Sequence, residues 1–329
     1  MKSKSESIYQ SVKNNNLEFT PLKIDLKDDA YHDPKGLFYT EWWYFDANLN
    51  NGYSAQMNVR VINLYFKKPF LIFVRLDIHK DGRLISNNKK ILLLKGFYAS
   101  KKTPLIKING KEIIKGHIDN KSGNWVFDLS FNFKKASANL KFVGITKGWK
   151  GELPGSNWGV ILPKATVIGR IKIGNKEIAV KGSGYHDHNW NLTSKAIFNF
   201  GWFWGKLNSK NHVITWATVF KNKNLGLRLL VINDINNGFY NLPNNDIKFI
   251  ASKIKRENGK LIPHCFTLSA ENKDVSLNVK MDYIDTHHVK IMGFMNYWRY
   301  HVKCKGSINY KGKSEKIDDV HIAEFFRFK

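Results

Sequence analysis

The segment from Gly182 to Trp190, which reads GSGYHDHNW, holds the densest group of side chains that could do chemistry. If the segment is extended, its side chains alternate between two faces. One face then carries His186, His188 and Trp190, and the other carries Tyr185, Asp187 and Asn189. Imidazole and carboxylate groups can transfer protons near neutral pH, so His188 and Asp187 are candidate catalytic residues. The alternative is a hydrogen-bonded polar network that locks a domain junction, with Gly182 and Gly184 permitting a bend.

A second cluster, Glu41 to Asp46 (EWWYFD), combines a carboxylate with large aromatic side chains. In a strand, Glu41 and Trp43 share one face. A carboxyl group in an apolar pocket has a raised pKa and can act as an acid. Because buried charges are usually paired, an ion-paired Glu41 beside core aromatics is the alternative. Glu41 is the third candidate catalytic residue.

Two histidines at positions i and i+2 of a strand, as in His186 and His188, can hold a metal ion. Glu41 or His301 could complete such a site, but no spacing in the sequence specifies a third ligand. Cys265 and Cys304 also lack the spacing of a metal or redox motif. The sequence therefore predicts no bound metal.

Tryptophans recur in a pattern that fits either a core or the wall of an apolar ligand cavity. Alternation places Trp202 and Trp204 on one face of the segment Gly201 to Gly205 (GWFWG), and Trp216 follows in the next predicted strand. The candidate ligand-binding residues are Trp43, Tyr185, His186, Asn189, Trp190, Trp202, Trp204 and Trp216.

The elements that must position these residues are strands. Segments rich in Val, Ile, Tyr, Phe and Trp alternate with turn signals such as Asn-Gly and Asp-Gly throughout the chain, and almost nothing indicates a helix. Glu41 to Leu49 and Tyr53 to Phe66, for example, form a predicted hairpin. We therefore expect an all-β protein made of two antiparallel meander barrels or sandwiches. The predicted organisation is a polar tail over 1–20, a first domain over 21–188 and a second over 189–329.

Composition excludes several other classes of protein. The net charge of +26 suggests an anionic partner, but only eight of the 53 basic residues are Arg and the Lys are scattered. Nucleic acid is therefore not an expected partner, whereas peripheral contact with an anionic membrane fits the Lys-rich surface. No run of about 20 apolar residues is present, and Met1 to Phe19 lacks an apolar leader core. These features predict a soluble chain, cytoplasmic or periplasmic after processing.

Together, the EWWY motif at Glu41, the GxGYHDHNW run at Gly182 and the WxWG motif at Trp202 resemble the signature of the carotenoid 1,2-hydratase (hydroxyneurosporene synthase) superfamily. The resemblance begins near Pro21 and extends to lipocalin-like pericyclases (Diels-Alderases) of fungal polyketide pathways. It implies two lipocalin-like, calycin-type domains packed together, with the ligand cavity near their junction. It also implies functional roles for His188 and Trp190 and no cofactor.

The chemistry implied by the resemblance is the addition of water to a terminal isoprenoid double bond. An acid protonates the alkene and water captures the carbocation, which requires a dry pocket with aromatic faces. The resemblance places a Tyr-x-Asp pair at positions that here read Thr215 and Ala217, so Asp187 or Glu41 would have to supply the acid. The expected function is cofactor-independent hydration, cyclisation or isomerisation of an apolar isoprenoid-like or polyketide-like ligand. The alternative is a non-catalytic carrier of such a molecule.

Overall fold

The computed structural model describes residues 18–32, 39–63, 71–153, 155–192, 201–221, 224–235, 238–291 and 295–328. These residues form strands with three short 3-10 turns and no α-helix, which confirms the all-β prediction. The chain divides into two compact units, residues 21–197 and residues 198–329 together with 1–20. Most of the predicted N-terminal tail (1–17) and the predicted strand end at Phe66 lie outside the described residues.

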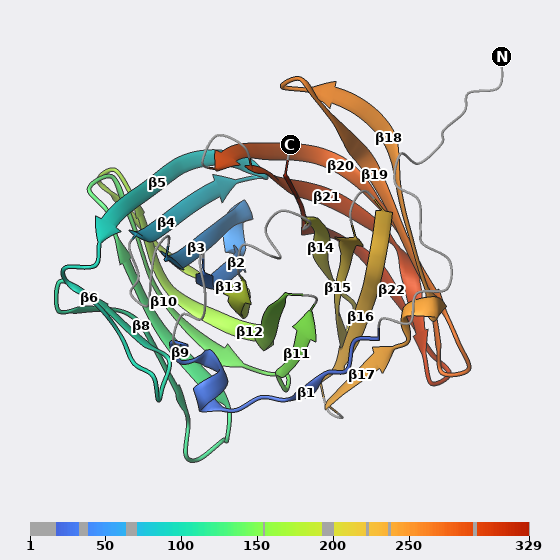
Figure 1. Ribbon diagram of the computed structural model, residues 1–329, viewed down its shortest axis with the longest axis horizontal. Coiled ribbons are helices and arrows are strands. Elements are labelled where there is room, and N and C mark those ends of the chain that lie inside the picture. Colours follow the sequence, from blue (N-terminus) through green and yellow to red (C-terminus); the bar gives the residue numbers. More distant parts are fainter. Residues whose placement is uncertain are drawn as a thin grey trace. The chain divides into compact units, whose positions relative to one another are not determined.

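The first unit is built on a thirteen-stranded sheet that curves into a nearly closed, barrel-like shape (Figure 1). The main path runs β5-β4-β3-β2-β13-β12-β10-β9-β8-β7-β6, and β11 pairs with both β12 and β1. Its strands are β1 (Leu22–Lys23), β2 (Thr40–Leu49), β3 (Tyr53–Ile62), β4 (Leu71–Lys80), β5 (Arg83–Leu93), β6 (Phe97–Ala99), β7 (Leu105–Ile108), β8 (Lys111–Ile118), β9 (Trp125–Asn132), β10 (Ala136–Gly144), β11 (Trp149–Leu153), β12 (Ser156–Ile173) and β13 (Lys176–Leu192). Two 3-10 turns, η1 (Leu26–Asp29) and η2 (Asn50–Gly52), complete the unit.

Turn chemistry sets the register of the predicted hairpin between β2 and β3. Asn51 has φ of 57° and Gly52 has φ of 71°, conformations that Asn and Gly adopt at low cost. The register pairs Phe45 with Met57, and both side chains lie in the core of the unit. Because alternate residues of each strand point into this core, the period-2 pattern of the sequence is satisfied.

The long strand β13 carries most of the predicted site residues. It pairs with β12 on one side and with β2 on the other, and this pairing continues to Leu192. The predicted domain boundary after His188 therefore lies inside a strand, whose last residues stay hydrogen-bonded within the first unit. Gly184 is required by close packing, since a Cβ atom there would lie 2.2 Å from Cε1 of Phe142.

The second unit is a nine-stranded antiparallel sheet in the order β17-β16-β15-β14-β22-β21-β20-β19-β18. Its core contains Phe203, Trp216, Phe249, Trp298 and Phe325. Its elements are β14 (Gly201–Asn208), β15 (His212–Lys221), β16 (Asn224–Asp234), β17 (Gly238–Leu242), η3 (Asn244–Asp246), β18 (Ile247–Glu257), β19 (Lys260–Glu271), β20 (Val275–Ile291), β21 (Met295–Tyr310) and β22 (Lys313–Phe328).

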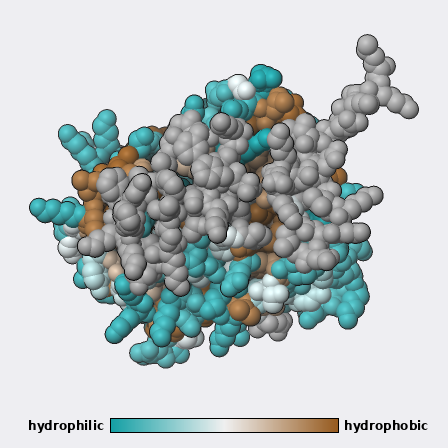
Figure 2. Space-filling model, viewed as in Figure 1, coloured by the Kyte–Doolittle hydropathy of each residue, from teal (hydrophilic) through white to brown (hydrophobic). Residues whose placement is uncertain are grey.

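The hydropathy of the surface and the burial of the two cysteines are consistent with the composition of the sequence. On the face drawn in Figure 2, hydrophilic residues cover much of the coloured surface, with smaller hydrophobic areas between them. Among the described residues, no helix is long and apolar enough to cross a membrane. Cys265 and Cys304 are buried and unpaired with each other, as expected for core residues.

Candidate functional site

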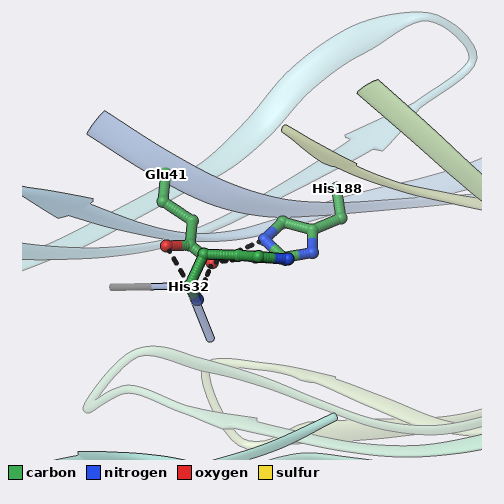
Figure 3. Close-up of side chains that lie close together, drawn as sticks. All are labelled: His32, Glu41 and His188. Carbon is green, nitrogen blue, oxygen red and sulfur yellow. Dashed lines mark hydrogen bonds and ion pairs between the residues drawn. The ribbon is translucent and has the colours of Figure 1, made fainter. Parts of the chain in front are cut away.

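Three side chains of the first unit converge on one point (Figure 3). They are His32 from the segment after η1, Glu41 from β2 and His188 from β13. Oε1 of Glu41 lies 2.9 Å from Nε2 of His188 and 3.2 Å from Nδ1 of His32. The structure thus brings together two of the three predicted catalytic residues and adds a histidine that the sequence reasoning did not single out.

Sheet pairing and a short turn build this arrangement. Antiparallel pairing places His188 opposite Trp43 and His186 opposite Phe45, so all four point to the same face of the sheet. The η1 turn, stabilised by a capping box between Asp25 and Asp28, lies over that face. Nε1 of Trp43 donates to the backbone oxygen of Asp29 at 3.0 Å and ties the turn to β2.

His188 is fully buried between two carboxylates. Its Nδ1 lies 3.1 Å from the backbone oxygen of Asp28 and 3.3 Å from Oδ1 of Asp29, and its Nε2 contacts Glu41. Burial alone lowers the pKa of His188, but the hydrogen bonds and charges of Asp29 and Glu41 outweigh burial and raise this pKa to about 9. His188 is therefore an imidazolium at neutral pH, held by groups at both ring nitrogens.

Glu41 is the hub of the cluster. Besides His188, it accepts hydrogen bonds from the Tyr39 hydroxyl at 2.6 Å and from the backbone N–H of His32 at 3.0 Å. Burial raises the pKa of Glu41, but the bonds from His188 and His32 outweigh it and lower this pKa below its ordinary value. The sequence left two alternatives for Glu41, a neutral buried acid and an ion-paired carboxylate. These contacts favour the ion-paired carboxylate.

His186 has a supporting position. Its Nε2 lies 3.0 Å from Oδ2 of Asp29, its Nδ1 lies 2.9 Å from the backbone oxygen of Tyr44, and its ring stacks on Phe45 at 3.7 Å. Asp29 therefore contacts both histidines of β13, and these contacts lower its pKa although burial opposes the shift. His186 fixes Asp29, and Asp29 fixes His188.

Two tryptophans frame the cluster. Trp43 stacks on His188 with ring centroids 4.4 Å apart, and Trp190 stacks on His32 at 4.5 Å. Glu41 and His188 have no exposed side-chain surface, whereas 26% of the His32 side chain is exposed. Of the three converging side chains, His32 is therefore the one that an incoming molecule can reach.

Asp187 belongs to a different network, on the opposite face of β13. Its Oδ2 accepts hydrogen bonds from Nε1 of Trp158 at 3.2 Å and from the Tyr185 hydroxyl at 2.9 Å. Nδ2 of Asn189 donates to its Oδ1 at 3.3 Å. The structure therefore separates Asp187, Tyr185 and Asn189 from His188 and Glu41, as strand alternation predicted.

The tryptophans of the second unit lie on two faces of their sheet. Trp202 stacks on Phe326 at 4.2 Å, and Trp204 shares its face. Trp216 lies opposite Gly205 in the register, with its ring in the core against Phe249. Trp216 is thus a core residue on the face opposite Trp202 and Trp204.

The positions where the resemblance implies a Tyr-x-Asp pair lie on the Trp204 face. Ala217 pairs with Trp204, and Thr215 pairs with Lys206. A different tyrosine and carboxylate occupy that face, since Glu324 also pairs with Trp204 and accepts a 2.5 Å hydrogen bond from the Tyr297 hydroxyl.

Asp29, His32 and Tyr39 are the site residues that sequence reasoning missed. The available signal was the run Asp28-Asp29-Ala30-Tyr31-His32, which holds two carboxylates and an imidazole shortly before Glu41. Three donor atoms, one each from His32, Glu41 and His188, lie within 4.8 Å of one another, so these residues could hold a metal ion. His186 is not part of that group.

Comparisons with known proteins rest on structure alone. No protein-family model matches the sequence, and no curated protein sequence matches it. Three solved structures are similar over nearly their whole length. An AttH-type protein of Nitrosomonas europaea has a TM-score of 0.64 at 13% identity, covering 94% of this chain and 98% of its own. Kievitone hydratase of Nectria haematococca has a TM-score of 0.56 at 12% identity, covering 99% and 98%.

The third structure, CghA, has a TM-score of 0.52 at 8% identity and covers 94% of this chain and 98% of its own. CghA is also known with bound Sch210972. At these identities the likeness establishes the fold and not the activity. The likeness shows that the chain has the all-β, lipocalin-like fold of these three structures.

Proposed function

We propose that this protein is a cofactor-independent enzyme that transfers protons to and from an apolar, unsaturated small molecule. The observation that carries the proposal is the Glu41–His32 pair. Nδ1 of His32 bonds to a buried carboxylate, while part of the ring is exposed. None of the described residues is hydrogen-bonded to Nε2 of His32, which is therefore the nitrogen offered to a substrate.

The surrounding groups hold this pair in a defined geometry. Glu41 accepts the Nδ1 proton of His32 and so selects the tautomer in which Nε2 can accept a proton. His188 and Tyr39 hold Glu41, and Asp29 holds His188, so the carboxylate has little freedom to rotate. This is the arrangement of an oriented general base and acid.

For a hydration, the reaction would proceed in two steps at His32. The step starts from the doubly protonated ring: Nε2–H gives its proton to one carbon of the double bond, the other carbon becomes positively charged, and His32 is left as the neutral Nδ1–H tautomer. Water adds to that carbon and returns a proton to Nε2, so the enzyme is regenerated. Trp190 stacks on the His32 ring and is the tryptophan that can border the cationic intermediate, whereas Trp43 is buried against His188. Cyclisation or isomerisation would use the same proton donor and acceptor.

The structural relatives support this class of reaction by analogy. One is named as a hydratase, and another has been obtained with a bound small molecule. A non-catalytic carrier is the second candidate function, since one relative has been obtained with a small molecule, and the partly exposed His32 ring stacked on Trp190 could contact a ligand without chemistry.

The test is turnover in isotopically labelled water. Acyclic isoprenoid polyenes and prenylated aromatic compounds are incubated with the protein in H₂¹⁸O, in the presence of a chelator, and analysed by mass spectrometry. We expect one labelled water to be added to at least one compound, and we expect H32Q or E41Q to lower the rate about 10²–10⁴-fold. H117Q, at an exposed position of β8, is the matched control and should retain full activity.

The other outcomes separate the alternatives. Equal turnover by wild type and H32Q would exclude the proposed role of His32. Quenching of tryptophan fluorescence by a polyene without any turnover would favour the carrier.

Contact with an anionic membrane is a separable part of the proposal. It is supported by the net charge of +26 and by exposed apolar side chains on the edge strand β5, Ile91 and Leu93, which lie beside Lys89 and Lys90. Basic and apolar side chains together favour peripheral binding. Co-sedimentation with phosphatidylserine vesicles, but not with phosphatidylcholine vesicles, is the expected result.

A further inference from the structure

We propose that Nδ1 of His32, Oε1 of Glu41 and Nε2 of His188 form a binding site for one divalent transition-metal cation such as Zn²⁺. Two imidazole nitrogens and one carboxylate oxygen are a donor set that such ions accept in proteins. The site lies at the centre of the proposed acid–base machinery and therefore rests on the same three residues (Figure 3).

The distances between donor atoms fit a single ion. Ligand atoms at about 2.1 Å from one ion are separated by about 3.0–3.4 Å in octahedral or tetrahedral coordination. Oε1 of Glu41 lies 2.9 Å from Nε2 of His188 and 3.2 Å from Nδ1 of His32. All three donor atoms lie within 4.8 Å of one another, which is close enough for one ion to be shared among them.

The groups behind the donors have the properties of an outer shell. Metal-binding histidines usually donate their second ring N–H to a carbonyl or carboxylate. Nδ1 of His188 lies 3.1 Å from the backbone oxygen of Asp28 and 3.3 Å from the Asp29 carboxylate. The Tyr39 hydroxyl holds the second oxygen of Glu41 at 2.6 Å. Donors held in this way lose little conformational freedom when they bind an ion.

Charge and access favour the same conclusion. Asp29 and Glu41 are two fully buried carboxylates, and an ion bound at Nε2 of His188 would displace the proton of that nitrogen, so the dication would take over the charge compensation that the imidazolium provides. Three protein ligands leave one or more coordination positions unfilled. The partly exposed His32 gives an ion a route to the site.

A bound cation and the proposed acid–base pair exclude each other. The ion would occupy the space of the His32–Glu41 hydrogen bond, so Nδ1 of His32 could no longer donate to Glu41. The cation therefore inhibits the metal-free reaction, and this consequence distinguishes the two proposals.

The test uses Co²⁺ as a spectroscopic probe of the full-length, chelator-treated protein. We expect visible absorption bands that saturate at one equivalent of Co²⁺ and are displaced by Zn²⁺. H32Q and E41Q should each weaken Co²⁺ binding more than about 100-fold, and D29N, which removes an outer-shell group, about 10–100-fold. H264Q is the matched control, because His264 contacts a single carboxylate, Glu257, in the other unit, and it should bind as the wild type does.

Each outcome has a defined meaning. Absence of one-equivalent Co²⁺ binding by the wild type, or binding that survives both H32Q and E41Q, overturns the metal site. H32Q changes a partly exposed side chain, so it tests the site even where E41Q unfolds the protein. Turnover in the presence of a chelator is measured in a separate experiment. The metal-site proposal can therefore be wrong while the proposed enzyme function is right, and the enzyme function can be wrong while the metal-site proposal is right.

Discussion

At the scale of single residues, the first unit contains a carboxylate, an imidazolium and a second carboxylate in a row with almost no solvent. Asp29, His188 and Glu41 are each at 0% exposure. Such an arrangement is stable only while all members are present, since removal of one leaves an uncompensated buried charge. The cluster is therefore a structural element of the unit as well as its candidate site.

Replacement of His188 tests this directly. H188Q removes the positive charge between Asp29 and Glu41, and we expect it to lower the free energy of unfolding of the first unit by about 3–5 kcal/mol. Urea denaturation followed by near-UV circular dichroism measures the loss. H117Q, exposed on β8, should change stability by less than about 0.5 kcal/mol. Wild-type stability in H188Q would show that His188 carries no compensating charge.

Asp187 should behave differently from Glu41, because the two lie on opposite faces of the sheet. D187N weakens the hydrogen bonds from Trp158 and Tyr185, and we expect a loss of about 1–3 kcal/mol in stability. Turnover per folded molecule should stay within a few-fold of the wild type. A D187N protein that folds but has lost all turnover would show that Asp187 is a catalytic residue.

At the scale of elements, the sequence predicts where strands lie more reliably than it predicts how long they are. The hairpin of β2 and β3 was predicted because apolar and polar residues alternate on both sides of an Asn-Gly turn. Strand β20 is longer than its alternation indicates, because it continues past an irregularity between Tyr283 and Asp285 as far as Ile291. An irregularity of this kind shifts the alternation by one residue, so a period-2 pattern cannot reveal that the strand resumes.

One carboxylate links two elements of the second unit and gives a pH prediction. Glu315 on β22 accepts hydrogen bonds from Ser209 at 2.6 Å and from the backbone of Asn211 at 2.9 Å, in the turn between β14 and β15. Burial raises the pKa of Glu315, but these bonds outweigh it and lower the pKa to about 2.

A lowered pKa in the folded state means that the stabilisation is complete above the ordinary pKa of 4.5 and is lost as the pH falls toward 2. E315Q should therefore cost about 1–3 kcal/mol at pH 7 and much less near pH 2. Unfolding midpoints of wild type and E315Q between pH 7 and pH 2 measure this convergence. A difference that is independent of pH would contradict the assignment. E271Q, on an exposed side chain of β19, serves as the control.

At the scale of the whole molecule, the N-terminal segment belongs with the C-terminal unit. The backbone oxygen of Phe19 accepts a 2.7 Å hydrogen bond from Asn241, and Phe19 is only 3% exposed. Residues 18–20 thus lie in the second unit, and the chain then forms the first unit before it returns to the second. The tail predicted over 1–20 is, at its described end, a packed part of the second unit.

Removal of the Phe19 ring should therefore affect the unit that is most distant from it in sequence. F19A is expected to destabilise residues 198–329 by about 3–5 kcal/mol, because a buried aromatic ring is lost. Hydrogen exchange should show faster exchange in β16 and β17 and unchanged protection in β2 and β13. L22A, at an exposed side chain of β1, is the control. Unchanged protection throughout the second unit would show that the contact contributes nothing.

The sequence by itself determined the local features of this protein. Alternation of side chains along strands is a property of neighbouring residues, so the all-β class and the two faces of the segment Tyr185 to Trp190 could be derived without tertiary information. The same rule correctly separated His188 from Asp187 and placed Trp43 on the face of Glu41.

Only the tertiary structure decided which residues meet His188. Glu41 lies 147 positions before His188 in the sequence, and Asp28 lies 160 positions before His188. Nothing in a local sequence pattern encodes contacts over such separations. They form because β13 pairs with β2 while the η1 turn packs over the same face, and sheet pairing is a non-local choice made by the whole core. For that reason the sequence did not reveal Asp29 and His32 as site residues, since their segment has no strand or helix pattern of its own.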